Sequence, residues 1–321
     1  MPTRPARRTA PRHSPPPQTL GPTVPTRTHY APVGPARQRA ARRRRPRPAV
    51  PGCLVWTVLA SLPAVIFLAI YLFFPGRTNV LLLGIDYAEP GSTTSRSDTL
   101  MLATVIPSRP YVGLLSIPRD LWVVIPGIGQ NRINTAHFYA ESQQPGSGPD
   151  LALQTVRLNF GVDVIYYARV RFEGFREVVN ALGGVDIELS EPTAGYPAGR
   201  HHLTGNKALA FVRNRAGTDD FFRMEQGQFM LKAVFKQLLR PGSWLRWPAV
   251  TRAALASIDT NLPAWMWPRL GFALLRVGPS QIDNHIITRQ MTTPFFTDAG
   301  ANVLDPNWEL INPLVKSIFG P

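Results

Sequence analysis

The longest unbroken apolar stretch of the chain runs from Gly52 to Phe74 and contains no charged residue. At about 1.5 Å per residue, a helix of this length crosses a hydrocarbon core of about 30 Å. The pattern therefore predicts a transmembrane helix over residues 51–75, in which Pro63 is tolerated as a kink. A buried core helix is the alternative, but the length of the run and the arginines directly before it favour a membrane span.

Shorter apolar runs of strand length follow the long stretch. The first begins after Thr78 and ends at Gly84, and its continuous apolar character is typical of a strand buried on both faces. Two more runs, Leu100–Ile106 and Tyr111–Ile117, are joined across two prolines between positions 107 and 110. This spacing predicts a hairpin within the same sheet.

Helical and strand patterns then alternate along the chain, which predicts an α/β fold with a mixed central sheet layered between helices. The expected strands are Ile165–Val170 and Val185–Leu189, and the expected helices are Asp150–Asn159, Phe172–Leu182, Thr204–Val212, Phe222–Leu239, Trp247–Ile258 and Ala264–Leu275. Residues 279–321 contain a strand-like Ile282–Thr288 and a helix-like Trp308–Phe319. They are either the last layer of the fold or a small appendage.

Composition separates the first 50 residues from the rest. They hold twelve arginines and twelve of the 33 prolines but no Asp, Glu or Lys, so they carry +12 of the formal +15. Few apolar residues are available to offset the entropy of ordering, so we expect residues 1–50 to be a disordered tail. Because positive flanks stay in the cytoplasm, we expect a cytoplasmic tail, one transmembrane helix over 51–75, and an extracytoplasmic domain over 76–321.

The basic tail restricts the partners to consider. Anionic lipid of the inner leaflet is the expected partner, since it lies next to the tail. A specific nucleic-acid partner is not expected, because the tail has no aromatic residue beyond Tyr30 and no DNA-binding fold beside it.

Five arginines and two aspartates occupy particular places among the predicted elements. Arginine offers a planar fork of donors to phosphate oxygens, and carboxylates hold Mg²⁺. Taken singly, each arginine is a surface or ion-paired residue, but together in a domain of balanced charge they require a compensating anion. The set predicts a diphosphate site: Asp86, Arg96, Asp98, Arg119, Arg213, Arg215 and Arg223.

The positions of these residues leave local alternatives open. Asp86 follows the first strand and is otherwise a turn residue, while Arg96 and Asp98 immediately precede the second strand and are otherwise a local ion pair. Arg213 and Arg215 share a face only if the end of the preceding helix is extended.

The order and the amino-acid sequences of these segments resemble those of the LytR-CpsA-Psr family of cell-envelope phosphotransferases. The resemblance runs from Asn79 to about Leu239, so its core is about 79–240. It rests on the following motifs: Asn-Val-Leu-Leu-Leu-Gly-Ile-Asp86, Arg96-Ser-Asp98-Thr-Leu-Met, Ser-Ile-Pro-Arg119-Asp120, Asn131-Arg-Ile-Asn134, Phe172-Glu-Gly-Phe175, Leu182-Gly-Gly-Val-Asp186, His202-Leu-Thr-Gly-Asn-Lys-Ala-Leu209 and Val-Arg213-Asn-Arg215.

The resemblance implies a membrane-anchored enzyme that moves a glycan polymer from a polyprenyl (undecaprenyl) pyrophosphate carrier to peptidoglycan, forming a phosphodiester link. It implies that Asp86 and Asp98 bind Mg²⁺, and that Asp98 and Arg119 are catalytic, with Asp98 as a candidate for the acceptor's proton. The pyrophosphate would be held by Arg96, Arg119, Arg213, Arg215, Arg223 and Gln228.

One departure from the family pattern lies after Arg223. The family usually continues as Arg-x-x-Arg-Gln-Gln, whereas this chain has Gln226 and Gly227 before the matching Gln228. The difference leaves open a non-catalytic binder or regulator of lipid-linked glycans. A polyprenyl pyrophosphate hydrolase is a further alternative, because it would use the same site with water in place of a sugar hydroxyl.

A polyprenyl chain also needs an apolar channel. Residues that would line it, or else form ordinary core, are Val178, Val179, Leu182, Phe229, Leu231, Val234, Phe235 and Leu238.

Overall fold

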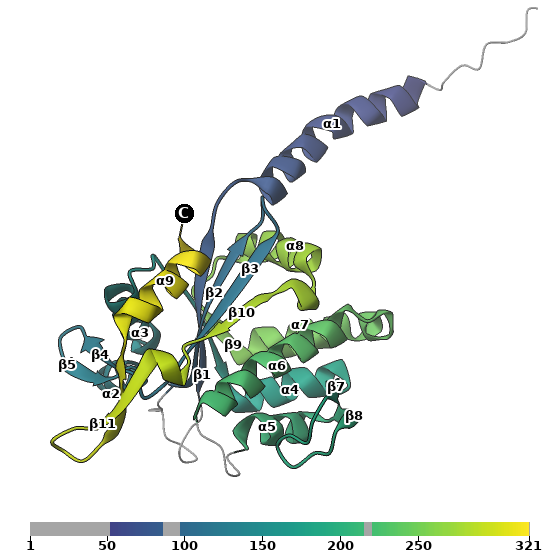
Figure 1. The fold of residues 1–321 in the computed structure, drawn as a ribbon. Coiled ribbons are helices and arrows are strands. Elements are labelled where there is room, and N and C mark those ends of the chain that lie inside the picture. The colour runs from purple at the N-terminus through teal and green to yellow at the C-terminus, as the bar shows by residue number, and fades with distance from the viewer. Residues whose placement is uncertain (1–51, 86–96, 215–219, 321) are drawn as a thin grey trace, which may run out of the picture. The chain divides into compact units, whose positions relative to one another are not determined.

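A six-stranded mixed sheet in the order β10-β3-β2-β1-β6-β9 forms the centre of the fold (Figure 1). The computed structural model describes residues 52–85, 97–214 and 220–320. The antiparallel pairs are β1–β2, β2–β3 and β6–β9, while β1–β6 and β3–β10 are parallel. The strands span Thr78–Ile85 (β1), Ser97–Ile106 (β2), Tyr111–Ile117 (β3), Tyr166–Arg171 (β6), Ile258–Thr260 (β9) and Asp283–Ile286 (β10).

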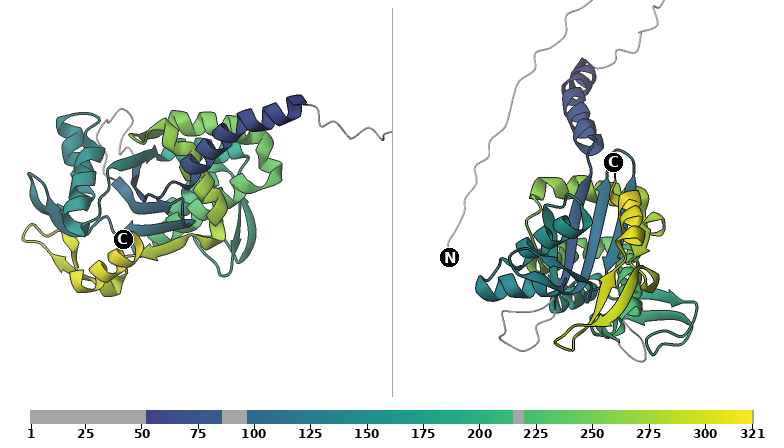
Figure 2. Two further views of the ribbon diagram at one scale, coloured as in Figure 1. Left: turned by 90° about the horizontal axis from the view of Figure 1, so that it is seen from above. Right: turned by 60° about the vertical axis from the view of Figure 1, so that its left-hand side comes forward.

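Helices cover both faces of the sheet, as the two views of Figure 2 show. Alternating side chains of one strand point to opposite faces, so Leu102 and Ala103 of β2 belong to two different apolar clusters. The first cluster joins the sheet to α3 (Gly148–Phe160) and α9 (Trp308–Phe319), next to α2 (Thr135–Gln143). The second joins it to α8 (Trp267–Val277).

A third apolar cluster lies among the helices beyond the sheet. It combines α4 (Phe172–Leu182), α5 (Gly205–Arg213) and α6 (Asp220–Leu239) with the hairpin of β7 (Val185–Leu189) and β8 (Gly199–Leu203). Helix α7 (Trp247–Ser257) packs closely on α4, where Gly174 leaves no room for a side chain, since an added Cβ would lie 2.4 Å from Ser257. This cluster holds α6 in place beside the sheet.

The C-terminal residues complete the fold as a last layer. Strand β10 extends the sheet beyond β3, and α9 packs on its first face. Between them lies a hairpin of β11 (Thr292–Phe296) and β12 (Asn302–Pro306), which approaches a second hairpin of β4 (Trp122–Ile125) and β5 (Gly129–Arg132). The fold therefore reaches well beyond the 79–240 stretch that carries the family motifs.

The predicted mixed α/β fold is confirmed, and each predicted strand and helix of residues 78–319 corresponds to an observed one. The sequence patterns missed the short hairpins β4–β5 and β11–β12, and they missed the pairing of β7 with β8. The predicted tail over residues 1–50 lies outside the described residues.

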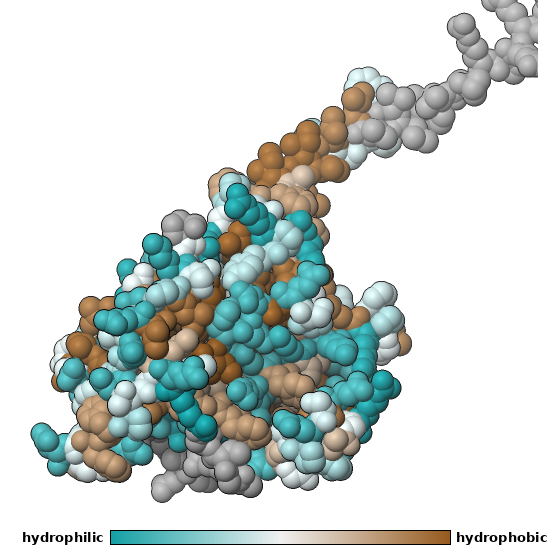
Figure 3. All heavy atoms as spheres, in the orientation of Figure 1, coloured by the Kyte–Doolittle hydropathy of each residue, from teal (hydrophilic) through white to brown (hydrophobic). Residues whose placement is uncertain are grey.

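Helix α1 (Gly52–Phe73) occupies most of the predicted spanning segment. Its apolar surface is visible in Figure 3, and its side chains at Trp56 and Phe67 are exposed. Within residues 52–85, 97–214 and 220–320, no helix meets the length and hydropathy that crossing a membrane requires. The transmembrane assignment is thus not confirmed by the described part of the chain.

Candidate functional site

A β-bulge positions Asp98. Strands β1 and β2 pair regularly up to Gly84, which lies opposite Thr99, and the register then shifts so that Ile85 lies opposite Ser97. Asp98 is the extra residue at this shift, and a bulge leaves such a residue unpaired and re-aims its side chain. Our expectation that Asp98 precedes the second strand is wrong, because β2 already begins at Ser97.

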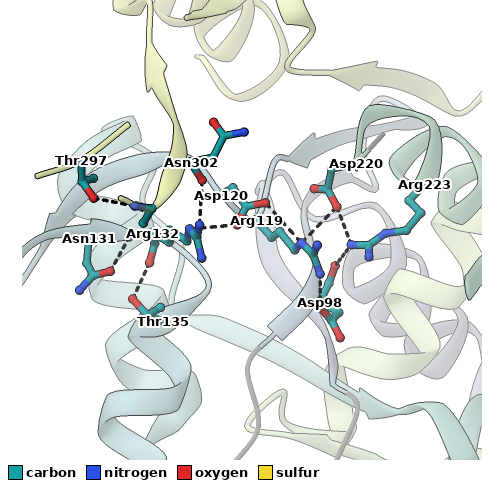
Figure 4. A network of polar contacts seen from close by, with 11 residues as sticks. Asp98, Arg119, Asp120, Asn131, Arg132, Thr135, Asp220, Arg223, Thr297 and Asn302 are labelled. Atoms are coloured by element: carbon teal, nitrogen blue, oxygen red, sulfur yellow. Dashed lines mark hydrogen bonds and ion pairs between the residues drawn. The ribbon is translucent and has the colours of Figure 1, made fainter. Parts of the chain in front are cut away.

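Arg119, two residues after β3, contacts three carboxylates (Figure 4). Its Nη1 donates to Oδ1 of Asp98 at 2.7 Å. Its Nε lies 3.2 Å from Oδ1 of Asp220 and 3.6 Å from Oδ2 of Asp120. The Arg119 side chain is only 23% exposed, so these carboxylates compensate a guanidinium that is largely removed from water.

Asp220 joins the start of α6 to this arginine. Its Oδ1 lies 2.6 Å from Nη2 of Arg223, one helical turn further on. Nη2 of Arg223 also donates to the main-chain oxygen of Asp98 at 3.3 Å. A carboxylate in the first turn is favoured by the helix dipole. Asp220 is not among the predicted site residues, although an acidic residue three positions before an arginine at a predicted helix start is a usable signal.

The pKa values of Asp220 and Arg119 are both raised, for different reasons. Burial raises the pKa of Asp220 and outweighs the opposing effect of Arg223 and Arg119. Burial by itself lowers the pKa of Arg119, but Asp220, Asp98 and Asp120 reverse this, so its pKa is raised. Arg119 is therefore a permanent cation, and Asp220 binds a proton more readily than a free aspartate does.

A cavity of ≈ 230 Å³ opens beside the cluster. Asp98, Asp220 and Arg223 form one side of it, and Arg213 also lines it. The remaining lining is mostly apolar: Leu100, Ile117, Phe172, Val212 and Met224. We call the charged part of this lining the charged mouth and the apolar part the apolar floor. A lining with both parts fits a ligand that has an anionic head and an apolar chain.

The structure brings together four of the predicted site residues: Asp98, Arg119, Arg213 and Arg223. Arg213 is the last residue of α5, and its guanidinium lies 5.2 Å from the centre of the Phe172 ring. The chain becomes extended at Asn214, directly after the end of α5. An extended chain at this point is the condition under which Arg213 and Arg215 were expected to share a face. Asp86, Arg96 and Arg215 lie outside the described residues.

Gln228 lies apart from the cavity. Its amide nitrogen donates to Oγ of Ser116 at 2.9 Å and to the main-chain oxygen of His285 at 2.7 Å. It thereby ties α6 to β3 and β10, while Ser116 itself lines the cavity. The predicted contact of Gln228 with pyrophosphate stays a prediction.

The departure from the family pattern falls on the inner face of α6. Gln226 is buried, and neither atom of its amide has a hydrogen-bond partner within the described residues. At Gly227 an added Cβ would lie 3.0 Å from the terminal methyl of Met101, so the glycine lets α6 approach β2 closely. Position 226 therefore faces the protein interior rather than the charged mouth.

The predicted channel residues do not line this cavity. Val179 and Leu182 are fully buried, and Val179 belongs to the third apolar cluster. Phe229 and Leu231 are exposed. The ordinary-core alternative therefore holds for Val179 and Leu182, and the apolar floor is built from other residues.

A divalent cation is compatible with part of this site. Among the residues that the structure describes, no group of three or more His, Cys, Asp and Glu could hold a metal ion. However, Mg²⁺ is commonly bound by one or two carboxylates together with phosphate oxygens of the substrate. Asp98, which lines the cavity, fits the role of one such ligand.

Comparison with known proteins identifies a family and relatives that share one name. The model of the LytR_cpsA_psr family matches residues 75–305. The chain is 40% identical over 141 residues to the polyisoprenyl-teichoic acid–peptidoglycan teichoic acid transferase TagU of Oceanobacillus iheyensis, covering 43% of each protein. It is 35% identical over 191 residues to TagU of Bacillus mycoides, covering 57% of this chain and 60% of the relative. The matches thus span about half the length of these curated relatives.

Solved structures show the same fold. B. subtilis TagV has a TM-score of 0.62 at 23% identity, covering 76% of this chain and 98% of TagV. TagT bound to LIIa-WTA has a TM-score of 0.60 at 25% identity, covering 78% of this chain and 93% of TagT.

Proposed function

This chain belongs to the LytR_cpsA_psr family, whose model matches residues 75–305, and we propose that it is a cell-wall glycopolymer transferase. Its donor would be a glycan linked to a polyprenyl pyrophosphate, and its acceptor peptidoglycan. The relatives named as teichoic acid transferases support this reaction class. The observation that carries the proposal is the Arg119–Asp220–Arg223 cluster at the mouth of an apolar-floored cavity.

The charged and the apolar parts of the cavity lining suit the two ends of the donor. Guanidinium groups of Arg223 and Arg213, which line the cavity, would bind the pyrophosphate oxygens, with Arg119 beside them. The apolar floor of Leu100, Ile117 and Phe172 would accept the start of the prenyl chain. Arg96, Arg215 and Gln228 remain predicted pyrophosphate ligands.

In the proposed reaction, the oxygen of an acceptor hydroxyl forms a bond to the phosphorus next to the glycan. The bond from this phosphorus to the bridging oxygen breaks, and its electron pair leaves with the polyprenyl monophosphate. Fixed guanidinium groups stabilise the charge that develops on the phosphoryl oxygens. The product is a phosphodiester between glycan and acceptor, and no nucleotide is required because the pyrophosphate is already activated.

We assign the hydroxyl proton to Asp220 rather than to Asp98. Asp220 lines the cavity, and burial raises its pKa, which favours uptake of a proton. Asp98 would instead hold Mg²⁺, with Asp86 as the second predicted ligand. When bound, the ion would neutralise charge on the phosphate oxygens.

Membrane attachment is part of the proposal. The apolar run of Gly52–Phe74, the arginines before it and the exposed side chains of α1 support a single-pass anchor. The tail would then lie in the cytoplasm against anionic lipid, and the α/β domain would lie outside the cell.

The test uses the full chain in detergent with a lipid-pyrophosphate glycan, Mg²⁺ and a soluble peptidoglycan fragment. We expect release of polyprenyl monophosphate together with a glycan–phosphate–peptidoglycan product, both detected by mass spectrometry. Release without transfer would identify a hydrolase instead. Tight donor binding without any release would identify a binder or regulator.

A further inference from the structure

A second cavity, of ≈ 470 Å³, also adjoins the charged cluster. Asp220 and Arg223 line both cavities, so the two spaces meet at this ion pair. Arg119 faces the second cavity only. Its opposite wall is the hairpin β11–β12, which contributes Thr292, Pro294, Asn302, Val303 and Leu304.

The hairpin is held against the Arg119 loop by several contacts. The main-chain nitrogen of Leu304 donates to the oxygen of Asp120 at 3.0 Å. Nη2 of Arg132 donates to the main-chain oxygen of Asn302 at 2.7 Å, and its Nε lies 3.2 Å from Oδ1 of Asp120. Arg132 thus links the hairpin to the residue next to Arg119, and the wall of the cavity is a built part of the fold.

The lining combines apolar surface with separate polar groups. The guanidinium of Arg289 lies 5.5 Å from the centre of the Phe221 ring, on the side of α6. The side chain of Asn302 is exposed, and Figure 4 shows its amide pointing away from Arg132. Sugar rings present apolar C–H faces and hydroxyl edges, so a lining of this mixed kind suits a hexopyranose unit.

The geometry of phosphoryl transfer indicates which of the two substrates this sugar unit belongs to. In phosphoryl transfer the attacking and leaving oxygens lie roughly in line, on opposite sides of the phosphorus. With the leaving polyprenyl phosphate in the first cavity, as proposed above, the adjoining second cavity is the space from which an attacking hydroxyl would reach the phosphorus beside Asp220 and Arg223.

We propose that the cavity between α6 and the hairpin β11–β12 is the acceptor subsite, and that it binds a hexopyranose unit of the acceptor glycan. The hydroxyl of this unit meets the donor at the Asp220–Arg223 pair. The inference rests on the proposed transferase function and adds the place and the chemical class of the second substrate.

Asn302 provides a clean test, because its contact with Arg132 uses the main-chain oxygen and survives substitution. Asn302→Ala removes one polar group from the cavity, and Asn302→Trp fills the space. Thr293→Ala is the matched control, since Thr293 is an exposed residue of the same hairpin that does not line the cavity. All variants are made in the full chain, and thermal melting verifies their folding.

Transfer is measured against the concentration of a soluble peptidoglycan fragment, and donor binding is measured separately by calorimetry. We expect Asn302→Ala to raise the half-saturating acceptor concentration about 3- to 10-fold, as for the loss of one hydrogen bond, and Asn302→Trp to raise it further. Donor affinity should stay within about twofold of the wild type. Thr293→Ala should behave like the wild type.

Three results would overturn the proposal. Acceptor dependence equal to that of Thr293→Ala would show that the cavity does not bind the acceptor. Weakened donor affinity with unchanged acceptor dependence would place the donor's own glycan there. If the wild type cleaves the donor but transfers to no acceptor, the transferase function itself fails. Calorimetry with the peptidoglycan fragment alone then tests the subsite separately. Absence of binding overturns the subsite, whereas binding that Asn302→Trp abolishes supports it.

Discussion

Arg119 is the residue on which the charged contacts of the site converge. Asp98 comes from β2, Asp120 follows Arg119 in the chain, and Asp220 begins α6. A guanidinium held by three carboxylates has little freedom to move, which suits a group that must be in place before charge develops on a phosphoryl oxygen. The same contacts make the site sensitive to the loss of any one partner.

We predict that Arg119→Ala and Asp98→Ala each lower turnover at least about 100-fold, as measured by release of polyprenyl monophosphate. Arg119→Ala removes the cation that holds Asp98, and Asp98→Ala removes the hydrogen bond that positions the Arg119 guanidinium. Arg157→Ala is a suitable control, because Arg157 is an exposed residue of α3 that lines neither cavity. Near-normal turnover in either site variant would refute the assignment.

A second buried carboxylate, Glu141, has a structural role. Its two oxygens accept hydrogen bonds from the main-chain nitrogens of Gly146 and Gly148, each at 3.0 Å, and Nη1 of Arg169 lies 3.0 Å away. Burial raises the pKa of Glu141, but the two hydrogen bonds and Arg169 outweigh it, so its pKa is lowered. Because the folded-state pKa lies below the unfolded one, this stabilisation is present at neutral pH and is lost as the pH falls through the folded-state value.

We therefore predict that Glu141→Gln lowers the free energy of unfolding by about 2 kcal/mol at pH 7. The difference from the wild type should shrink once the pH falls below about 4. Denaturant titrations at several pH values measure both effects. Glu188→Gln, at an exposed position, should change stability little at any pH. A Glu141 effect that does not vary with pH would contradict this explanation.

At the scale of elements, close approach between a helix and the sheet depends on particular small residues. Gly113 of β3 faces α9, and an added Cβ would lie 2.7 Å from Cγ2 of Ile318. The helix could keep its place only if that side chain moved. Residues far apart in the chain thus restrict each other's size.

We predict that Gly113→Ala lowers the free energy of unfolding by about 1–3 kcal/mol through overpacking. Gly242→Ala is the matched control, because nothing lies within 4 Å of its added Cβ. Equal stability of the two variants in denaturant titrations would show that α9 adjusts without cost.

Element prediction succeeded where the pattern was long and local. Helices α4 and α9 begin and end where the sequence places them. Asp98 shows the limit, since a pairing shift between two strands, rather than any local pattern, puts it in the site. The hairpin β11–β12 was missed because its short strands alternate weakly between buried and exposed positions.

At the scale of the whole molecule, the C-terminal layer and the main core form one body. Ile311, Val315 and Ile318 of α9 are buried in the first apolar cluster. Nη1 of Arg77, just before β1, donates to the main-chain oxygen of Ile318 at 2.6 Å. The two ends of the α/β domain are thus joined.

We predict that a chain ending at Gly278 loses cooperative thermal unfolding, because it lacks β10, the hairpin and α9. Near-ultraviolet circular dichroism during heating measures this loss. Deleting residues 1–40 is the comparison, and it should preserve both cooperative unfolding and activity in detergent. A cooperative transition in the chain ending at Gly278 would show that the last layer is dispensable.

The sequence by itself determined the element pattern, the family and the arginine positions Arg119, Arg213 and Arg223, because periodicity and motif order are properties of neighbouring residues. Only the tertiary structure decided which groups neutralise those arginines and what lies beside them. Arg223 meets Asp98 across 125 positions of the chain, and Gln228 meets Ser116 across 112. Such contacts depend on how layers pack, so the pairing of Asp220 with Arg119 and the hairpin wall of the second cavity emerged only from the folded chain.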